Sequence, residues 1–206
     1  MKEHPILFSG PMILAVLGGR KTQTRRIVKL PDGASPNAEF HHIDKFGAAV
    51  FTDGTCVRCP YGQQGDRLWV RETTEADYEL CDSAVLARYS ADRKPVLYSG
   101  SADPEDEGTS IALWDYPREV RPSIHMPRWA SRIDLEITGV RVERLQDINE
   151  KDARAEGVAA SRVGPCQDGL FYSLHRDSFI ELWESINGPG SWDNNPFVWC
   201  ITFKRL

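Results

Sequence analysis

The stretch Gly19-Arg20-Lys21-Thr22-Gln23-Thr24-Arg25-Arg26 decides how this sequence is interpreted. The apolar residues before it recur at helical spacing, and they are Met12, Ile13, Val16 and Leu17. This pattern predicts a helix that begins near Ser9-Gly10-Pro11 and ends at Gly18-Gly19, because proline suits a first helical turn and glycine a helix C-terminus. A polar, basic segment therefore follows directly on an apolar helix.

The charge of this segment contrasts with that of the whole chain. The 206 residues include 25 Lys and Arg against 30 Asp and Glu, a net charge of −5, whereas five of the ten residues from Arg20 to Lys29 are basic. Proteins that coat nucleic acid usually carry a basic surplus, so the acidic balance argues against broad coating of DNA or RNA. A small site for one nucleotide, built from this local cluster, remains open.

The rest of the chain predicts a mixed α+β fold with a small, bent sheet in a single domain, 1–206. Strands are expected at 6–8, 67–72, 133–142 and 197–203, and the last reads as central because both its faces are apolar. The apolar alternation slips at Thr138-Gly139, which predicts a β-bulge. Further helices are expected from Asn149 to Gly157 and around 179–186. Two segments, 31–60 and 76–128, read as loop-rich insertions.

Lys21 and Thr24 are the first candidates for chemistry. A lysine becomes a base when burial and neighbouring cations lower its pKa, and a threonine becomes a nucleophile beside such a base. Two residues three apart point to opposite faces of a regular strand, so a shared site requires a turn or bulge near Gln23. The alternative is a solvated basic loop.

The stretch Gly19–Arg26 after an apolar helix resembles the signature segment of the ASCH family. Further resemblances lie in Gly65-Asp66-Arg67-Leu68-Trp69-Val70, in Leu145–Ile148 through Ala155-Glu156-Gly157, and in Val198–Phe203. The resemblance implies a PUA-like small bent β-barrel with about three helices, an association with RNA, and a long-loop form typical of phages and prophages.

One branch of the family hydrolyses the acetyl amide of N(4)-acetylcytidine without a metal or cofactor. The resemblance implies Lys21 as proton acceptor, Thr24 as nucleophile and Glu156 as proton donor. Glu156 stands at the predicted end of its helix, where the macrodipole disfavours a carboxylate, so we expect a raised pKa that suits a general acid. The alternative for Glu156 is an exposed helix residue.

Five further residues are candidates for substrate binding: Arg20, Arg25, Arg26, Arg128 and Trp129. A guanidinium pairs with a phosphate or a base edge, and an aromatic ring flanked by cations suits base stacking. The alternatives are surface ion pairs for the arginines and a position in the core or as a loop anchor for Trp129.

The five cysteines favour reduced thiols in a cytoplasmic protein. Cys56 and Cys59 have zinc-type spacing, and His41, His42 and Cys81 are further possible ligands, but a lone pair is a weak signal and no metal is predicted. No apolar run suits a membrane span, and no nucleotide-binding glycine motif occurs.

The resemblance thus implies an acyl-amide hydrolase acting on a modified cytidine, as a nucleoside or one exposed nucleotide of RNA. Two alternatives use the same basic cleft: a non-catalytic binder of RNA or modified bases, and a ribonuclease. Lysine and arginine near a threonine serve binding as well as catalysis.

Overall fold

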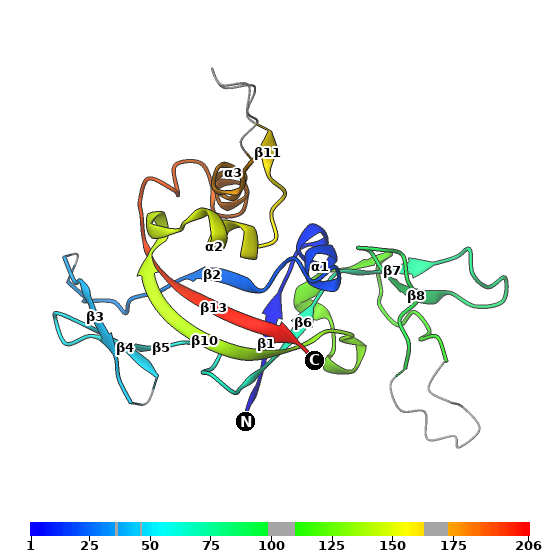
Figure 1. Cartoon of the computed structure of the whole chain (residues 1–206). Helices are drawn as coiled ribbons and strands as arrows, with labels where there is room; N and C mark the ends of the chain where they lie inside the picture. The colour runs from blue at the N-terminus through cyan, green and yellow to red at the C-terminus, as the bar shows by residue number, and fades with distance from the viewer. Residues whose placement is uncertain (36, 46, 99–109, 163–172) are drawn as a thin grey trace.

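A computed structural model describes residues 1–35, 37–45, 47–98, 110–162 and 173–206. Its centre is a five-stranded sheet in the order β1-β6-β10-β13-β2 (Figure 1). The strands are β1 (Glu3–Leu7), β6 (Arg67–Arg71), β10 (Asp134–Arg144), β13 (Phe197–Arg205) and β2 (Gln23–Ile27). β1 and β6 are parallel, and the other neighbours are antiparallel. The mixed α+β class and the central place of the last strand are confirmed.

The sheet bends at the position that the slipped alternation predicts. The register between β10 and β13 shifts between Ile137 and Gly139, which is a β-bulge. A Cβ at Gly139 would lie 2.8 Å from the Thr202 hydroxyl, so the bulge leaves no room for a side chain there.

The expected barrel is not closed. In the part of the chain that the structure describes, β1 and β2 are the two edges of the sheet and do not pair with each other. A side chain joins them instead: Arg26 Nη2 donates to the Leu7 carbonyl at 2.9 Å. The region between these two edges is called here the β1–β2 gap.

Three α-helices are present among the described residues: α1 (Gly10–Leu17), α2 (Glu150–Ala155) and α3 (His175–Asn187). The Asn149 side chain caps α2 by accepting from the Asp152 N–H at 2.9 Å, and Gly157 follows with φ +83°, so both predicted ends of this helix are confirmed. None of the described helices has the length and apolar character that a bilayer crossing requires.

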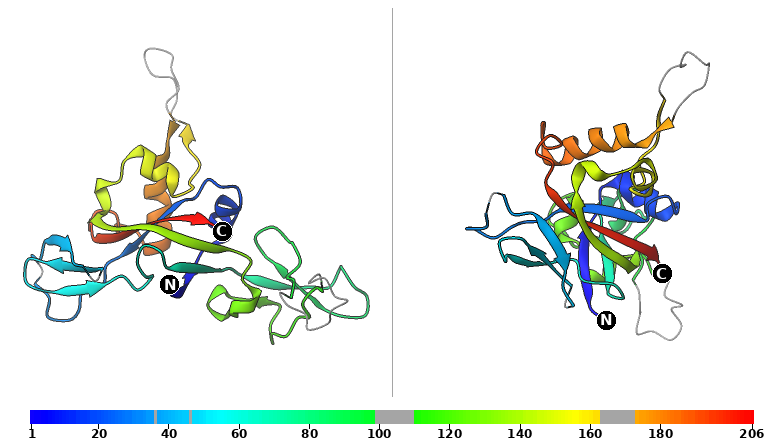
Figure 2. Two further views of the ribbon diagram at one scale, coloured as in Figure 1. Left: turned by 60° about the horizontal axis from the view of Figure 1, so that its bottom comes forward. Right: turned by 60° about the vertical axis from the view of Figure 1, so that its left-hand side comes forward.

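The two predicted loop-rich insertions also contain small sheets. The segment 31–60 forms β3 (Phe40–Ile43), β4 (Ala48–Phe51) and β5 (Cys56–Arg58). The second insertion carries β7 (Thr74–Asp77), β8 (Leu86–Tyr89) and β9 (Val120–Arg121). These sheets extend from opposite sides of the central one (Figure 2). Strands this short show too little alternation to be recognised from sequence.

The remaining short elements connect the larger ones. Three 3-10 turns are η1 (Ser123–His125), η2 (Arg128–Ala130) and η3 (Leu145–Asp147). Two-residue strands β11 (Ser161–Arg162) and β12 (Ser173–Leu174) pair just before α3.

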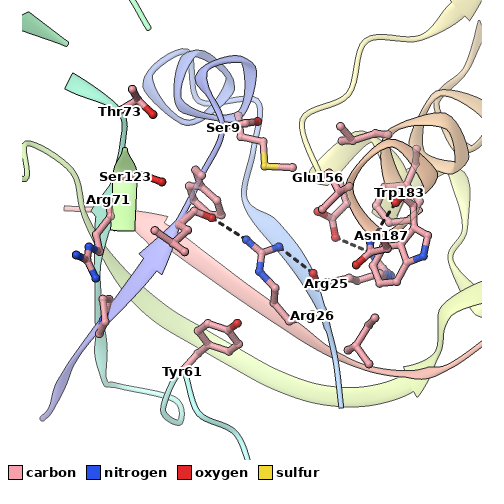
Figure 3. Close-up of a pocket in the computed structure, with 18 residues that line it drawn as sticks. Ser9, Arg25, Arg26, Tyr61, Arg71, Thr73, Ser123, Glu156, Trp183 and Asn187 are labelled. Carbon is pink, nitrogen blue, oxygen red and sulfur yellow. Dashed lines mark hydrogen bonds and ion pairs between the residues drawn. The ribbon is translucent and has the colours of Figure 1, made fainter. Parts of the chain in front are cut away.

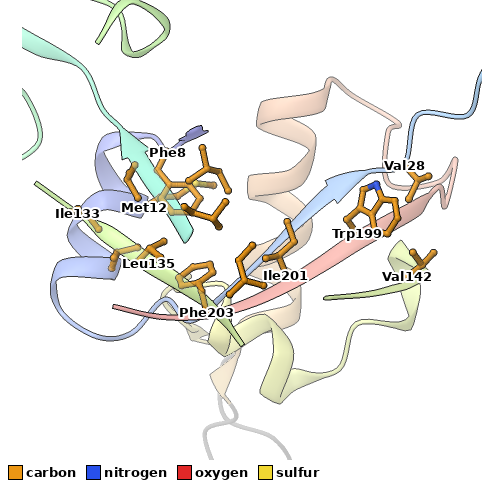
Figure 4. Close-up of a cluster of buried hydrophobic side chains, with 14 of the residues drawn as sticks. Phe8, Met12, Val28, Ile133, Leu135, Val142, Trp199, Ile201 and Phe203 are labelled. Atoms are coloured by element: carbon orange, nitrogen blue, oxygen red, sulfur yellow. The ribbon is translucent and has the colours of Figure 1, made fainter. Parts of the chain in front are cut away.

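The main core lies between α1 and the bent sheet. Phe8 and Met12 lie beside the buried residues of β10 and β13 (Figure 4). Three side chains of the predicted strand, Ile133, Leu135 and Ile137, are fully buried. This core fixes the end of α1, and thereby the start of the basic segment.

Candidate functional site

Lys21 lies in the turn between α1 and β2 and is completely buried. The N–H groups of Arg20 and Lys21 both donate to the Ala15 carbonyl, at 2.8 and 3.0 Å, which holds the turn against α1. The Lys21 ammonium donates to the Gln23 carbonyl, the Glu156 carbonyl and Glu156 Oε2, each at 2.9 Å. These three bonds use all its N–H groups. Burial lowers the pKa of Lys21, although the charge of Glu156 opposes this shift.

Glu156 reaches Lys21 because the end of α2 docks on the same turn. The Thr22 N–H donates to the Ala155 carbonyl at 2.8 Å. The Glu156 side chain is only 4% exposed, and its Oε1 accepts from Arg25 Nη1 at 3.1 Å. The structure therefore brings Lys21 and Glu156 together across 135 residues of sequence. Two cations, Lys21 and Arg25, thus contact the Glu156 carboxylate. The effect of the helix dipole on this carboxylate stays a prediction.

Thr24 lies in β2, opposite Ile201 of β13, and is fully buried. Its hydroxyl accepts a hydrogen bond from Arg26 Nη1 at 2.9 Å. Lys21 precedes the strand, so strand alternation does not set the direction of its side chain. The Phe8 ring lies 5.3 Å from Lys21 Nζ and 5.7 Å from Arg26 Cζ. Among the described residues, no hydrogen bond joins Lys21 to Thr24.

Arg25 is enclosed by carboxylates. Its guanidinium contacts Glu143, Asp152 at 3.1 Å and Glu156 at 3.1 Å, and its side chain is fully buried. Arg141 also bonds to Glu143 and Asp152, each at 2.8 Å. Together with Lys21, this network holds three cations against three carboxylates. Arg25 is therefore held in buried ion pairs. It also lines the main pocket described below, and its role in substrate binding stays a prediction.

Gln23 closes the network from the strand. With its amide oriented to satisfy its neighbours, it donates to Asp152 Oδ1 at 3.2 Å and accepts from Arg25 Nη1 at 2.8 Å. The face of β2 that carries Gln23 and Arg25 is thus fixed to α2 and β10.

A cavity of about 610 Å³, called here the main pocket, occupies the β1–β2 gap. Its volume falls within the range of small-molecule sites. Its lining comes from β1, α1, β2, β6, η1, the end of α2 and α3: Pro5, Leu7, Phe8, Ser9, Met12, Arg25, Arg26, Ile27, Tyr61, Arg71, Thr73, Ser123, Glu156, Phe179, Leu182, Trp183, Ile186 and Asn187.

The lining of the main pocket lies on both sides of Arg26. In Figure 3, Glu156 and Trp183 lie on one side of Arg26, and Arg71, Thr73 and Ser123 lie on the other. Lys21 and Thr24 stand behind this lining, each one contact away from it: Lys21 through Glu156 and Thr24 through Arg26.

Three predicted binding residues lie elsewhere. Arg20 is exposed and outside the pocket lining. Arg128 pairs with Glu3 at 3.2 Å and Asp134 at 2.9 Å. Trp129 stacks on Tyr98, with ring centroids 5.0 Å apart, and lines a second pocket of about 550 Å³.

The placement of Arg128 and Trp129 in the same cleft as Lys21 was therefore wrong. The apolar cluster of the second insertion, which includes Tyr89, Val96 and Met126, packs against the Trp129 ring. A large aromatic ring is stabilised by packing against apolar side chains, and the apolar side chains next to Trp129 belong to the second insertion.

Sequence reasoning missed most of the pocket lining. The apolar stripe of the helix predicted around 179–186 lines the main pocket with Phe179, Leu182, Trp183 and Ile186. Phe179 and Trp183 are also buried in a core cluster, whereas Ile186 is 57% exposed, and the sequence pattern does not distinguish the two cases. Tyr61, Arg71, Thr73 and Ser123 carry no local signal.

The candidate zinc ligands do not gather. Among the described residues, no group of three or more His, Cys, Asp or Glu side chains is arranged to hold a metal ion. Cys56 and Cys59 are free thiols, and the Cys56 thiol contacts the Gly54 carbonyl.

Comparisons with protein-family models, with curated protein sequences and with solved structures found no match to this chain.

Proposed function

We propose that this protein is an ASCH-type hydrolase that removes an acyl group from the amide nitrogen of a modified cytidine. The observation that carries the proposal is the buried contact of 2.9 Å between Lys21 and Glu156 at the wall of the main pocket. A lysine whose pKa is lowered by burial is suited to accept a proton. The open, bent sheet with a pocket between its edges is in keeping with a PUA-like fold.

The proposed chemistry requires the Lys21 amine to reach the Thr24 hydroxyl, which contacts Arg26 in this structure. The neutral Lys21 amine then takes the Thr24 hydroxyl proton while Thr24 Oγ1 bonds to the acyl carbon. The bond from that carbon to the cytosine nitrogen then breaks, and the proton passes from Lys21 through Glu156 to the departing nitrogen. Water next cleaves the acyl-threonine ester, which releases the carboxylic acid and restores the threonine.

One observation favours a second function, the non-catalytic binding of RNA or modified bases. Thr24 is fully buried, and its hydroxyl contacts Arg26 rather than Lys21. For catalysis, the ligand has to displace the Arg26 contact so that Thr24 becomes reachable. A binder needs no such change.

The test is incubation of the protein with N(4)-acetylcytidine, with cytidine followed by chromatography. Three near-isosteric variants address the proposed roles: Lys21→Met, Thr24→Val and Glu156→Gln. The matched control is Lys29→Met, because Lys29 is an exposed cation outside the pocket lining.

We expect turnover in the parent protein and in Lys29→Met, and a loss of about 100-fold or more in each of the other variants. Circular dichroism checks that each variant is folded. Absence of turnover in the parent protein, together with measurable binding of cytidine, would favour the binder.

A further inference from the structure

The charged lining of the main pocket is unevenly compensated. In the described part of the chain its charged residues are Arg25, Arg26, Arg71 and Glu156. Glu156 contacts Lys21 and Arg25, and Arg25 contacts two further carboxylates. Within the described ranges, Arg26 and Arg71 therefore remain as cations without a counter-ion.

Arg26 is held only by neutral oxygens of the described residues. Its Nη1 donates to the Thr24 hydroxyl and the Arg25 carbonyl, and its Nη2 donates to the Leu7 carbonyl, each at 2.9 Å. A guanidinium has five N–H donors. Two of them, one on Nε and one on Nη2, thus have no acceptor in this part of the structure.

Arg71, on the opposite wall of the pocket, is similar (Figure 3). Its Nη2 contacts the Ile124 carbonyl, and its guanidinium carbon lies 5.3 Å from the Trp69 ring. Its buried Nε has no hydrogen-bond partner among the residues that the structure describes.

Carboxylates compensate some arginines of this acidic protein. Seven described arginines contact a carboxylate: Arg25, Arg88, Arg121, Arg128, Arg132, Arg141 and Arg144. Arg26 and Arg71 are not among them, and because both line one cavity, they set a positive potential there, which favours an anionic ligand.

We propose that the ligand of the main pocket carries a phosphate, and that Arg26 binds this phosphate. The ligand is then a cytidine nucleotide rather than a neutral nucleoside. This inference rests on the proposed function for the nucleoside part of the ligand alone. A guanidinium fork matches phosphate oxygens, and the hydroxyls of Ser9, Thr73 and Ser123 line the same cavity as further donors.

The first test uses the unmodified protein. Calorimetry compares cytidine with cytidine 5′-monophosphate at low and at moderate salt. We expect the monophosphate to bind about 10-fold or more tightly, and the difference to shrink as salt rises. Equal affinities for the two probes would overturn the inference.

The second test assigns the phosphate to Arg26. Arg26→Gln should reduce the preference for the monophosphate to about 3-fold or less, while Lys29→Gln retains it. Because Arg26 joins β1 to β2, Arg71→Gln serves as a second variant in case the first unfolds, and it should also lower the preference. Retention of the full preference in a folded Arg26→Gln would overturn the assignment.

A third arm identifies the source of the phosphate. A short single-stranded RNA with one cytidine is compared with the monophosphate. Tighter binding of the RNA indicates a nucleotide within a chain, and equal binding indicates a free mononucleotide. Both outcomes support a phosphate site.

The inference and the proposed function fail separately. A preference for the monophosphate without turnover of an acetylated cytidine would contradict the proposed hydrolase function and would support the phosphate site. Turnover of N(4)-acetylcytidine without any preference for phosphate would do the reverse.

Discussion

Gly157 lies directly against Lys21. A Cβ at position 157 would come within 2.7 Å of the Lys21 Cβ and within 2.8 Å of the Ala15 Cβ. Gly157 also has φ +83°, a conformation that favours glycine. The end of α2 can therefore approach α1 and the basic segment closely, and this approach places the Glu156 carboxylate on the Lys21 ammonium.

Gly157→Ala should destabilise the protein by about 2–4 kcal/mol, because the positive φ and the overpacking add. Urea unfolding measures the change. Gly33→Ala is the matched control, since Gly33 has φ +90° and a Cβ there would meet no described atom within 4 Å. We expect about 1–2 kcal/mol there. Equal losses at both positions would contradict the close packing of Gly157 on Lys21.

The Lys21–Glu156 ion pair should couple strongly. Removal of one buried partner leaves the other charge poorly compensated, so Lys21→Met should reduce the free energy of unfolding by about 3–5 kcal/mol. The double variant with Glu156→Gln should lose less than the two single losses added, by about 1–3 kcal/mol.

The exposed pair Lys204–Glu136, with 3.1 Å between its charged atoms, is the control for this double-mutant cycle. Its coupling should not exceed about 1 kcal/mol. A Lys21–Glu156 coupling as small as that of the control would mean that the buried contact is not formed in solution.

The parts of the fold that follow from local chemistry could be predicted from the sequence. Asn149 and Gly157 mark the ends of α2 because a cap and a positive φ are local requirements. The slip of the apolar alternation at Thr138-Gly139 marks the bulge, because side chains alternate between the two faces of a strand. The small sheets at 40–58 and 74–89 were not predicted, because strands of three or four residues depend on partner strands that only the tertiary structure supplies.

The candidate site, too, has a part that could be predicted from the sequence and a part that could not. Lys21 and Thr24 stand out in one dense segment, whereas the partners of Arg25 lie 118 to 131 residues away along the chain. No local pattern distinguishes an arginine that is bound by carboxylates from one that has no carboxylate partner among the described residues. Arg25 and Arg26 are neighbours in sequence, and strand alternation directs them to opposite faces of β2.

The reactivity of the Cys59 thiol should report how the 31–60 segment packs against the main core. A hydrogen bond with Ser83 lowers the pKa of Cys81, whereas burial raises the pKa of Cys59 to about 11 and that of Cys200 to about 12. The thiolate is the reactive form, so at pH 7 iodoacetamide should modify Cys81 about 100-fold faster than Cys59.

Peptide mass spectrometry over time measures these rates, and the difference should disappear in denaturant. Modification of Cys59 as fast as Cys81 in the native protein would contradict the packing of the 31–60 segment against the main core.

The pH dependence of activity provides the sharpest test of Lys21. Burial lowers the pKa of Lys21 below its ordinary value of 10.5, and a proton acceptor works in its neutral form. With N(4)-acetylcytidine as substrate, kcat/KM should therefore rise with pH and level off below pH 10.5. Lys21→Arg, which stays protonated, should lose about 100-fold or more and show no such rise.

The contribution of Lys21 to the free energy of unfolding should also increase with pH in this range. Between the lowered pKa and 10.5 the unfolded chain binds the additional proton, so the contribution of Lys21 to the free energy of unfolding increases with pH. The difference in stability between the parent protein and Lys21→Met, measured from about pH 7 to 10, isolates this contribution from other titrating groups. A kcat/KM that is flat or falls over this range would rule out Lys21 as the proton acceptor, whatever the stability difference shows.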